Sequence, residues 1–208
     1  MIMPGFFDLF SPMPPVLTTP RLTLRPVSRR DADDLFEYAQ DDQVSRHVLW
    51  TAYRSRSEAV DYIRAVRRQY RSGFPGVFAI EYRENRKMIG TIGFMWINRE
   101  YRSAEVGYSL NRSYWNRGIM TEALDEVLRY GFEQLRLNRI EAQYETDNPA
   151  SGRVMEKAGM VREGVLRQRL KNKGRFVDVV LCAVLSQDDR IRRKKQENSR
   201  KAANTLEV

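Results

Sequence analysis

A polar turn between an expected strand and an expected helix has the residues of an anion-binding loop. Ala104-Glu-Val-Gly-Tyr-Ser-Leu110 alternates in polarity, and a strongly periodic apolar pattern begins at Ile119. The first turn of a helix offers backbone N–H groups without acceptors and the positive end of the helix dipole. Gly118 lets a ligand approach the backbone closely, and Arg117 adds charge. The turn therefore predicts a cradle for a pyrophosphate, although glycine at a helix start is also a common capping or packing feature.

A second strand-to-helix junction lies about 30 residues further along the chain. A strand is expected to end near Glu145, Asn148 is a favourable N-cap, and Pro149 occupies the first helical position. Gly159 is a favourable C-cap for the helix that follows. Taken alone, this segment is as typical of plain strand–turn–helix architecture as of a ligand site.

The elements that must position these two junctions follow from hydrophobic periodicity. Helices are expected over 28–40, 55–71, 119–135 and 148–159. Strands are expected over 21–27, 77–80, 87–97, 104–110, 139–145, 160–170 and 176–185. The order β-α-α-β-β-β-α-β-α-β-β predicts a single mixed α/β domain.

Three segments carry a family resemblance when they are taken in order. They are Ala104-Glu-Val-Gly-Tyr-Ser-Leu110, Tyr114-Trp-Asn-Arg-Gly-Ile-Met-Thr-Glu-Ala123, and Asn148-Pro-Ala-Ser followed by Glu156-Lys-Ala-Gly-Met160. With the opening segment 15–26, they resemble the GNAT superfamily of acetyl-CoA-dependent N-acetyltransferases, in particular its ribosomal-protein-alanine N-acetyltransferase branch. The resemblance covers about residues 15–186. It implies an α/β (α+β) domain with a mixed, mostly antiparallel sheet flanked by helices, and acetyl-CoA held between two splayed central strands.

The resemblance assigns cofactor contacts to both junctions. The backbone of the preceding strand would pair with the pantetheine arm, amides of the loop and first helical turn would hold the pyrophosphate, and Asn148 would contact the cofactor. The residues are Tyr108, Ser109, Leu110, Trp115, Asn116, Arg117, Gly118, Ile119, Met120, Thr121, Asn148 and Ser151. Trp115, Asn116 and Met120 depart from the family pattern, and Met120 in place of a small residue implies a tighter or shifted pyrophosphate pocket.

Two residues are candidates for catalysis. The reaction needs a neutral amine to attack the thioester, and Glu105 is the candidate base, acting directly or through water. Many family members use a tyrosine on the helix after Asn148 as general acid, and Met155 stands at that position here. Ser151 matches a serine of the N-terminal-acetylating branch and is the candidate partner of the leaving sulfur. The alternatives are an exposed strand carboxylate for Glu105 and an ordinary first-turn serine for Ser151.

The expected acceptor is an N-terminal α-amine of a protein or peptide, either of a ribosomal protein or of another protein. At pH 7 roughly 10% of such amines are neutral, against roughly 0.04% of lysines, so they need less help from a base. Trp50 and Tyr53 lie between the first two helices, where this family shapes its acceptor site, although aromatic core packing is an equal alternative. Two other readings stay open: acetylation of a small amine such as a polyamine, amino acid or antibiotic, and a non-catalytic acyl-CoA-binding or RNA-associated protein.

Composition limits the classes of protein and of site. The 208 residues include 36 Lys and Arg, 27 Asp and Glu, one His and one Cys, with a formal net charge of +9. A single Cys excludes an internal disulfide, and with a single His it excludes a zinc-finger cluster, so no metal is expected. No apolar run is long enough to span a membrane, and no signal peptide is recognised, which makes the cytoplasm the expected location. Cys182 is expected to be an inert core thiol, and His47 a loop residue.

The expected organisation is an N-terminal extension (1–14), an N-acetyltransferase domain (15–186) and a basic polar tail (187–208). The tail has almost no apolar content, which is typical of a solvated helix or a disordered extension. Its charge offers weak support for a nucleic-acid partner, and a monomer or homodimer is expected.

Overall fold

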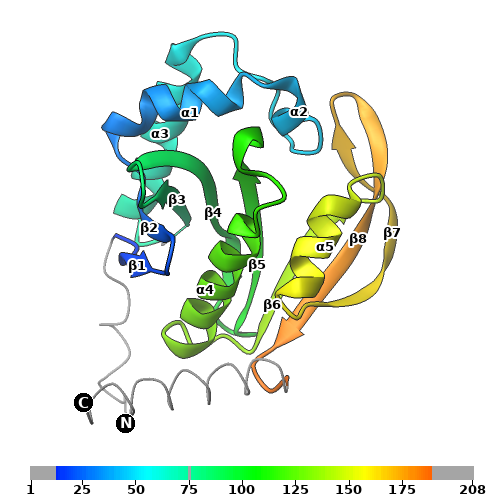
Figure 1. Ribbon diagram of the computed structural model, residues 1–208. Helices are drawn as coiled ribbons and strands as arrows, with labels where there is room; N and C mark the ends of the chain where they lie inside the picture. Colours follow the sequence, from blue (N-terminus) through cyan, green and yellow to red (C-terminus); the bar gives the residue numbers. More distant parts are fainter. Residues whose placement is uncertain (1–12, 75, 189–208) are drawn as a thin grey trace, which may run out of the picture.

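Eight strands form one mixed sheet in the computed structural model, which describes residues 13–74 and 76–188 (Figure 1). The strands are β1 (Leu17–Thr18), β2 (Leu22–Pro26), β3 (Val77–Tyr82), β4 (Lys87–Asn98), β5 (Ser103–Leu110), β6 (Arg139–Glu145), β7 (Val161–Asn172) and β8 (Arg175–Leu185). Their spatial order is β1-β2-β3-β4-β5-β6-β8-β7. All neighbours are antiparallel except β5 and β6, which run parallel in the centre of the sheet.

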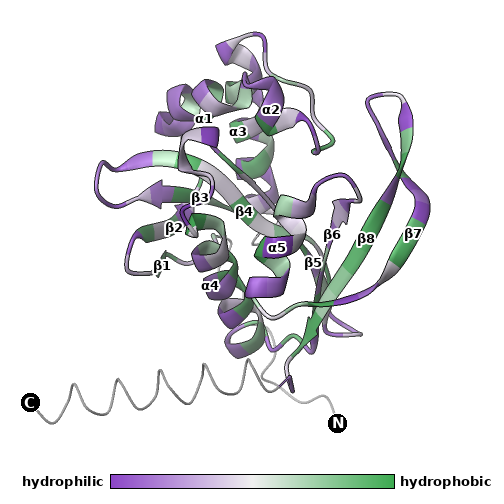
Figure 2. Cartoon of the chain, turned by 45° about the vertical axis from the view of Figure 1, so that its right-hand side comes forward, coloured by the Kyte–Doolittle hydropathy of each residue, from purple (hydrophilic) through white to green (hydrophobic). Residues whose placement is uncertain are grey.

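The helices lie on both faces of this sheet. They are α1 (Ala32–Ala39), α2 (Asp42–Ser45), α3 (Arg56–Arg71), α4 (Ile119–Glu133) and α5 (Pro149–Lys157), with short 3₁₀ turns η1 (Arg29–Asp31) and η2 (Arg112–Tyr114). One core joins α4 and α5 to the sheet, and a second joins α1 and α3 to the opposite face of β3 and β4. In Figure 2 the residues coloured as hydrophobic follow the strands and inner helix faces, while the outer helix faces are coloured as hydrophilic.

The two central strands separate soon after they meet. β5 and β6 pair only at Ser103, Ala104 and Glu105, opposite Arg139, Ile140 and Glu141. Beyond this point β5 remains paired with β4, and β6 remains paired with β8. The facing edges of residues 106–110 and 142–145 are thus left without a neighbouring strand, which confirms the predicted splayed centre.

The predicted order of long elements is confirmed, and the differences lie in the first helix and in short pieces. The expected helix 28–40 divides into η1 and α1, because the Asp31 carboxylate caps the turn at Ser28 and also binds Arg25. The chain then leaves the helix at Gln40, and Asp41 caps the separate helix α2. Neither α2 nor the two-residue strand β1 was predicted. The strand expected over 160–170 continues to Asn172, because the turn falls at Lys173 and Gly174, both with positive φ.

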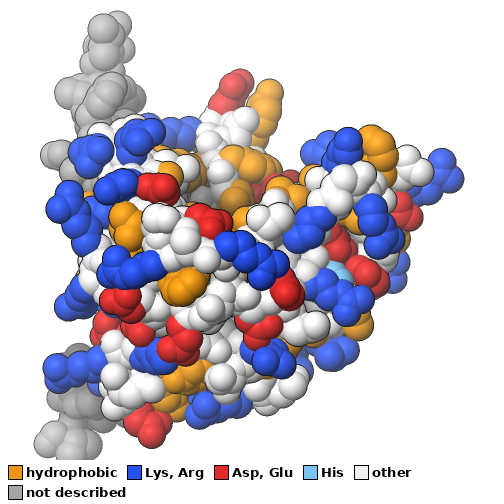
Figure 3. Space-filling view, turned by 90° about the horizontal axis from the view of Figure 1, so that it is seen from above, with side chains coloured by type: hydrophobic (Ala, Val, Ile, Leu, Met, Phe, Trp, Pro, Cys, Tyr) orange, Lys and Arg blue, Asp and Glu red, His pale blue; other side chains and the backbone are white. Residues whose placement is uncertain are grey.

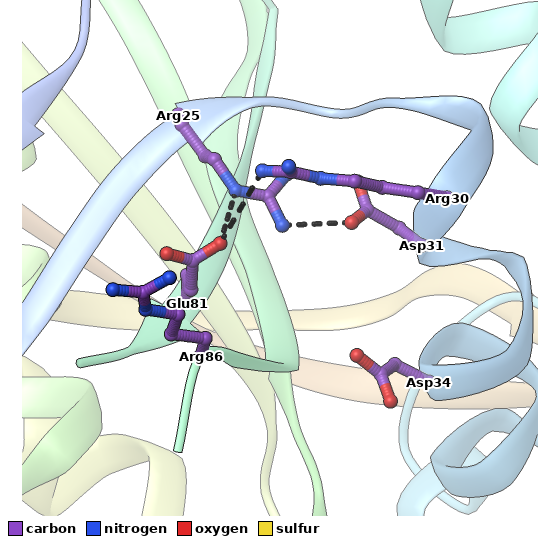
Figure 4. Close-up of a pocket in the computed structure, with 6 residues that line it drawn as sticks. All are labelled: Arg25, Arg30, Asp31, Asp34, Glu81 and Arg86. Atoms are coloured by element: carbon purple, nitrogen blue, oxygen red, sulfur yellow. Dashed lines mark hydrogen bonds and ion pairs between the residues drawn. The ribbon is translucent and has the colours of Figure 1, made fainter. Parts of the chain in front are cut away.

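A network of buried ion pairs fixes η1 against the sheet. The Arg25 guanidinium binds Asp31 at 2.7 Å and Glu81 at 2.6 Å, and Arg30 approaches Glu81 at 3.6 Å. These groups line a hollow of about 350 Å³ together with Asp34 and Arg86 (Figure 4). Arg25, Asp31 and Glu81 neutralise one another's charges, so we interpret the residues around this hollow as a structural ion-pair network.

Most of the predicted N-terminal extension and of the tail lies outside the described residues. Within the described residues, every helix is too short or too polar to cross a membrane.

Candidate active site

Glu105 stands where the two central strands begin to diverge, and a bulge in β4 determines what faces it. Phe94 pairs with Val106 and Trp96 pairs with Glu105, so Met95 is the extra residue of a β-bulge. Such an insertion moves the next side chain to the other face of the strand. Trp96 therefore lies on the same face as Glu105. Gly107 leaves room for the bulge, because a Cβ there would meet the Met95 sulfur at 2.9 Å.

Both oxygens of the Glu105 carboxylate accept hydrogen bonds. Trp96 Nε1 donates to Oε2 at 2.7 Å from β4, and Gln143 Nε2 donates to Oε1 at 2.9 Å from β6. Gln143 reaches Glu105 because it lies two residues beyond the pair Glu105–Glu141, on the same face of the sheet. The carboxylate is thus held in a fixed orientation across the base of the opening.

The loop before α4 has the backbone of an anion cradle. Asn116 and Gly118 adopt left-handed conformations, with φ of 58° and 71°. The first hydrogen bond of α4 runs from the Glu122 amide to the Gly118 carbonyl at 3.1 Å, so the amides of Ile119, Met120 and Thr121 have no acceptor in the helix. The side chains of Ile119 and Met120 are buried in the core, which leaves only their backbone for a ligand.

Side chains from the turn between β1 and β2, from β3 and from the loop itself hold this cradle in place. Arg21 donates to Glu122 of α4 at 2.7 Å and to the Arg117 carbonyl at 2.9 Å. The Thr19 hydroxyl also donates to Glu122, at 2.6 Å, and these donors hold the pKa of the Glu122 carboxyl below its ordinary value despite its partial burial. The Arg117 guanidinium lies over the rings of Tyr82 and Tyr114, 5.5 and 5.2 Å from their centroids.

Trp115 completes the same loop from its exposed side. Its indole Nε1 donates to the Leu110 carbonyl at 2.9 Å, which ties the loop to the end of β5. The four consecutive residues 115–118 thus form one loop between β5 and α4, and their contact with a cofactor stays a prediction.

Ser151 meets residues from both sides of the opening. Its amide donates to Asn148 Oδ1 at 3.3 Å, so Asn148 caps α5 as predicted. The Tyr108 hydroxyl of β5 lies 2.9 Å from Ser151 Oγ and 3.2 Å from the Ser151 carbonyl. Burial raises the pKa of Tyr108, which keeps its phenol protonated and able to donate near neutral pH. A proton donor and a hydroxyl are thus in contact across the opening.

Met155 does not face this pair. It is 2% exposed and belongs to the core between α5 and the sheet. Met155 cannot donate a proton, as the sequence indicates, and the phenol that lies beside Ser151 is Tyr108 of β5.

The opposite face of β5 is joined to the first helices. The Ser109 hydroxyl lies 3.0 Å from Thr91 Oγ1 and bonds to the buried Tyr38 of α1.

Trp50 and Tyr53 lie 5.4 Å apart between ring centroids and pack against the α1–α3 core, and burial raises the pKa of Tyr53 to about 12. Both rings are half-buried, so their packing role is established and an acceptor contact stays a prediction.

His47 belongs to a bridge that the sequence did not reveal. Its Nδ1 lies 2.8 Å from the buried Glu145 and 3.4 Å from Asp147, at the end of β6. Glu145 also accepts from Asn172, and the ammonium of Lys173 donates to the carbonyls of Ser45 and Val48. These contacts tie the loop after α2 to β6 and to the β7–β8 hairpin. The histidine is visible beside acidic side chains in Figure 3.

His47, Glu145 and Asp147 are also residue types that can bind a metal ion. Among the described residues their ligand atoms form a cluster, within 4.8 Å of one another. His47 and Glu145 are already paired with each other, and Glu145 with Asn172, so the cluster is a hydrogen-bonded bridge.

Trp96, Gln143 and Arg21 are residues of the site that sequence reasoning missed. Tyr108 was predicted as a cofactor contact, but its contact with Ser151 was not. Gln143 had a signal, since Glu141, Gln143 and Glu145 alternate on one face of β6. Trp96 had none, because an ordinary alternation would place it on the other face.

Comparison with known proteins agrees with this geometry. Residues 21–161 match the family described as Acetyltransferase (GNAT) domain. The chain is similar to the Uncharacterized N-acetyltransferase p20 of Bacillus licheniformis, with 37% identity over 83% of this chain and 97% of the relative. It is 29% identical to the [Ribosomal protein uS5]-alanine N-acetyltransferase of Escherichia coli (strain K12), over 83% of this chain and 91% of that protein. Among solved structures it is similar to Mycobacterium smegmatis RimJ in complex with CoA-disulfide, with 26% identity, a TM-score of 0.71, and coverage of 79% of this chain and 81% of the other.

Proposed function

We propose, from the premise that this chain belongs to the GNAT family of N-acetyltransferases and uses acetyl-CoA, that its acceptor is the N-terminal α-amine of a protein, most specifically of a ribosomal protein. The observation that carries the proposal is the Glu105 carboxylate, oriented by Trp96 and Gln143 at the base of the opening between β5 and β6. One carboxylate suits an acceptor that is already partly neutral at pH 7, as an α-amine is and a lysine is not. The similarity to a ribosomal-protein-alanine N-acetyltransferase supports the same acceptor.

The cofactor contacts follow from the two junctions. The unpaired edge of residues 106–110 is proposed to bind the pantetheine arm as an added strand would, and Asn148 to contact the cofactor. The amides of residues 116–121 are proposed to hold the pyrophosphate at the start of α4.

Each proposed catalytic residue has one task in the transfer. The amine nitrogen attacks the thioester carbonyl while Glu105 takes its proton, directly or through water. The C–S bond then breaks, and the electron pair leaves with sulfur as a thiolate. Ser151 is proposed to donate a hydrogen bond to this thiolate, and Tyr108 to donate to Ser151.

The acidic residues of the first helices are bound to other groups of the protein, which disfavours a small polycationic acceptor. Asp31 pairs with Arg25, Asp33 with Arg56, and Asp34 accepts from the Met88 amide. The remaining three pair likewise: Glu37 with Lys87, Asp41 with Arg112 and Asp42 with Arg54. A polyamine site needs carboxylates that the protein's own cations do not neutralise. Five of these six are paired with a cation, some of them only through exposed ion pairs, and Asp34 is bound by a backbone amide.

The test is an acetylation panel read by mass spectrometry. Acetyl-CoA is supplied with peptides that begin with Ala or Ser, the same peptides with a blocked N-terminus and an internal lysine, polyamines and amino sugars. Acetylation confined to free α-amines supports the proposal, and a cytoplasmic site of action follows from a ribosomal acceptor. Acetylation of a small amine or of the blocked peptides would replace it with another acceptor class. Binding of acetyl-CoA with no product from any amine would favour the non-catalytic alternative.

A further inference from the structure

The outer face of α3 is lined with arginines that none of the proposed chemistry uses. Arg29 of η1 and five arginines of α3 surround a hollow of about 550 Å³, whose apolar lining is Val60 and Ile63. The five are Arg56, Arg64, Arg67, Arg68 and Arg71. We call this surface the α3 arginine groove. Lys and Arg side chains gather over this end of the molecule in Figure 3, at the left of the view.

Half of these guanidinium groups have no partner within the described part of the chain. Arg29, Arg68 and Arg71 are exposed and make no hydrogen bond or ion pair there. Arg56 and Arg64 pair with Asp33 and Asp61, but all four side chains are more than half exposed. Exposed ion pairs of this kind contribute little, so a multivalent anion can displace them. The groove therefore carries more positive charge than the carboxylates beside it balance.

The shape of the groove is that of a stripe. From Arg56 to Arg71 the helix advances about 22 Å, at 1.5 Å per residue. Each strand of a duplex carries one phosphate per ~3.4 Å along the helix axis, so the stripe matches roughly six phosphates of a strand stacked with the same rise, and fewer of an extended strand. A stripe of arginines with a hollow between them suits a linear polyanion better than a single small anion.

Two features separate a nucleic acid from an acidic membrane. A membrane-binding amphipathic helix presents its apolar face to the lipid. In α3 the apolar residues Ala59, Ile63, Val66 and Tyr70 are buried against the sheet. Every basic residue of the groove is an arginine, whose planar fork binds phosphate oxygens in pairs and stacks on bases.

We propose that the α3 arginine groove binds the phosphate backbone of single-stranded RNA. This proposal is independent of the acceptor, because the groove shares no residue with the proposed active site. A groove of this kind would hold the enzyme on a ribonucleoprotein while a protein N-terminus enters the active site elsewhere.

The experiment is a fluorescence-anisotropy titration of a short labelled single-stranded RNA with the full chain over a range of salt concentrations. The test variant is Arg29→Gln/Arg68→Gln/Arg71→Gln, which removes three cations without breaking an internal ion pair. Each phosphate contact on a single strand contributes about 0.7 to the slope of log K against log salt, so the slope should fall by about 2. Affinity should fall roughly tenfold or more, while acetylation of a peptide in the absence of RNA stays unchanged.

The matched control is Arg167→Gln/Arg169→Gln/Arg175→Gln, which removes the same charge from exposed positions on β7 and β8. It should keep most of the affinity and the slope. An equal loss of RNA affinity in both triple variants would overturn the proposal, because it would show general electrostatic attraction. An unchanged RNA affinity in the test variant would show that the groove does not bind RNA. Loss of binding to phosphatidylserine vesicles or to an acidic peptide, with RNA binding absent, would also overturn the assignment. Circular dichroism and thermal melting confirm that each variant is folded.

Discussion

Glu105 is the residue on which the proposed deprotonation of the amine depends. Glu105→Gln keeps the size of the side chain but removes the base, so turnover should fall by roughly 10²–10⁴-fold. The amine must then lose its proton to solvent, and its pKa lies near 7.7–8.0. The pH profile of kcat/KM should therefore move upward. The measurement is the rate of acetylation of an Ala-starting peptide across the pH range from weakly acidic to alkaline.

Glu141→Gln is the matched control for this change. Glu141 is paired directly opposite Glu105 in the sheet, but it binds Arg139 at 3.0 Å and has no proposed role in catalysis. It should keep the wild-type profile, and both variants should keep the affinity for acetyl-CoA. A profile for Glu105→Gln that is identical to the wild type would show that another group, or water, removes the proton.

Tyr108 and Ser151 should act as one unit if both assist the leaving thiolate. Tyr108→Phe removes the hydroxyl 2.9 Å from Ser151 Oγ, and Ser151→Ala removes the other partner. Each should lower kcat, and the double variant should lose little more than the worse single variant, because residues in one hydrogen-bond network are not additive. A thiol is already a tolerable leaving group, with an ordinary pKa near 8.5, so a loss of roughly ten- to a hundredfold is expected.

The readout is single-turnover kinetics for the two single variants and the double variant. Tyr144→Phe serves as control. Tyr144 belongs to β6 and packs against Gly152, the neighbour of Ser151 in α5, but it has no role in the proposed mechanism. Full additivity of the two single losses would contradict a shared role.

Motifs identified the site at this scale only in part. Glu105, Gly118, Asn148 and Ser151 could be named from the sequence because each stands at a fixed place in a strand-to-helix junction. The contact of Trp96 with Glu105 and that of Tyr108 with Ser151 could not be named. Trp96 faces Glu105 only because Met95 is an extra residue in β4, and a bulge leaves no trace in an apolar run. Met155 stands at the family's tyrosine position as predicted, and its burial in the core was not evident from the sequence.

Among the elements, the start of α4 gives a specific prediction about the affinity for acetyl-CoA. Gly118 caps α4 with φ of 71°, and a Cβ there would have Arg21 Nη2 at 3.7 Å as its nearest neighbour. Gly118→Glu therefore meets backbone strain of about 1–2 kcal/mol but no collision with the fold. Its carboxylate lies at the proposed pyrophosphate site, so the affinity for acetyl-CoA should fall roughly tenfold or more, measured by calorimetry.

Gly73→Glu is the matched control for this element. Gly73 follows α3 with φ of 77°, and a Cβ there meets nothing within 4 Å. Both variants should lose similar stability, a few degrees in Tm for a chain of this size. Only Gly118→Glu should lose the cofactor. Equal affinity in the two variants would remove the loop from the cofactor site.

Long elements were predictable because their periodicity and caps agree with their burial. The helix α5, from the Asn148 cap to Lys157, is the clearest case. The break between η1, α1 and α2 was not predictable, since it depends on Asp31 binding an arginine six residues earlier and on Asp41 capping a new turn. Local pattern does not contain such side-chain contacts.

In the whole molecule, the opening between β5 and β6 divides the sheet into two parts. Their direct strand pairing is limited to three positions at the base. Tyr108 and Ser151 meet across the opening on the α5 side, and the His47–Glu145 bridge joins the loop after α2 to β6 on the opposite side. A ligand that binds both facing edges would connect the two parts of the sheet where β5 and β6 do not pair with each other.

Acetyl-CoA should therefore stabilise the whole domain and do so at the two facing edges. At a concentration of 100 times Kd, binding to the folded state alone adds about 2.7 kcal/mol, or roughly 5–10 °C in Tm for a chain of this size. Hydrogen exchange should slow most in residues 106–110 and 116–121. Pantetheine, which lacks the pyrophosphate, should protect the strand edge without the loop at the start of α4. Protection by acetyl-CoA that is confined to the α1–α3 side would contradict the proposed path of the cofactor, because that side contributes no residue to it.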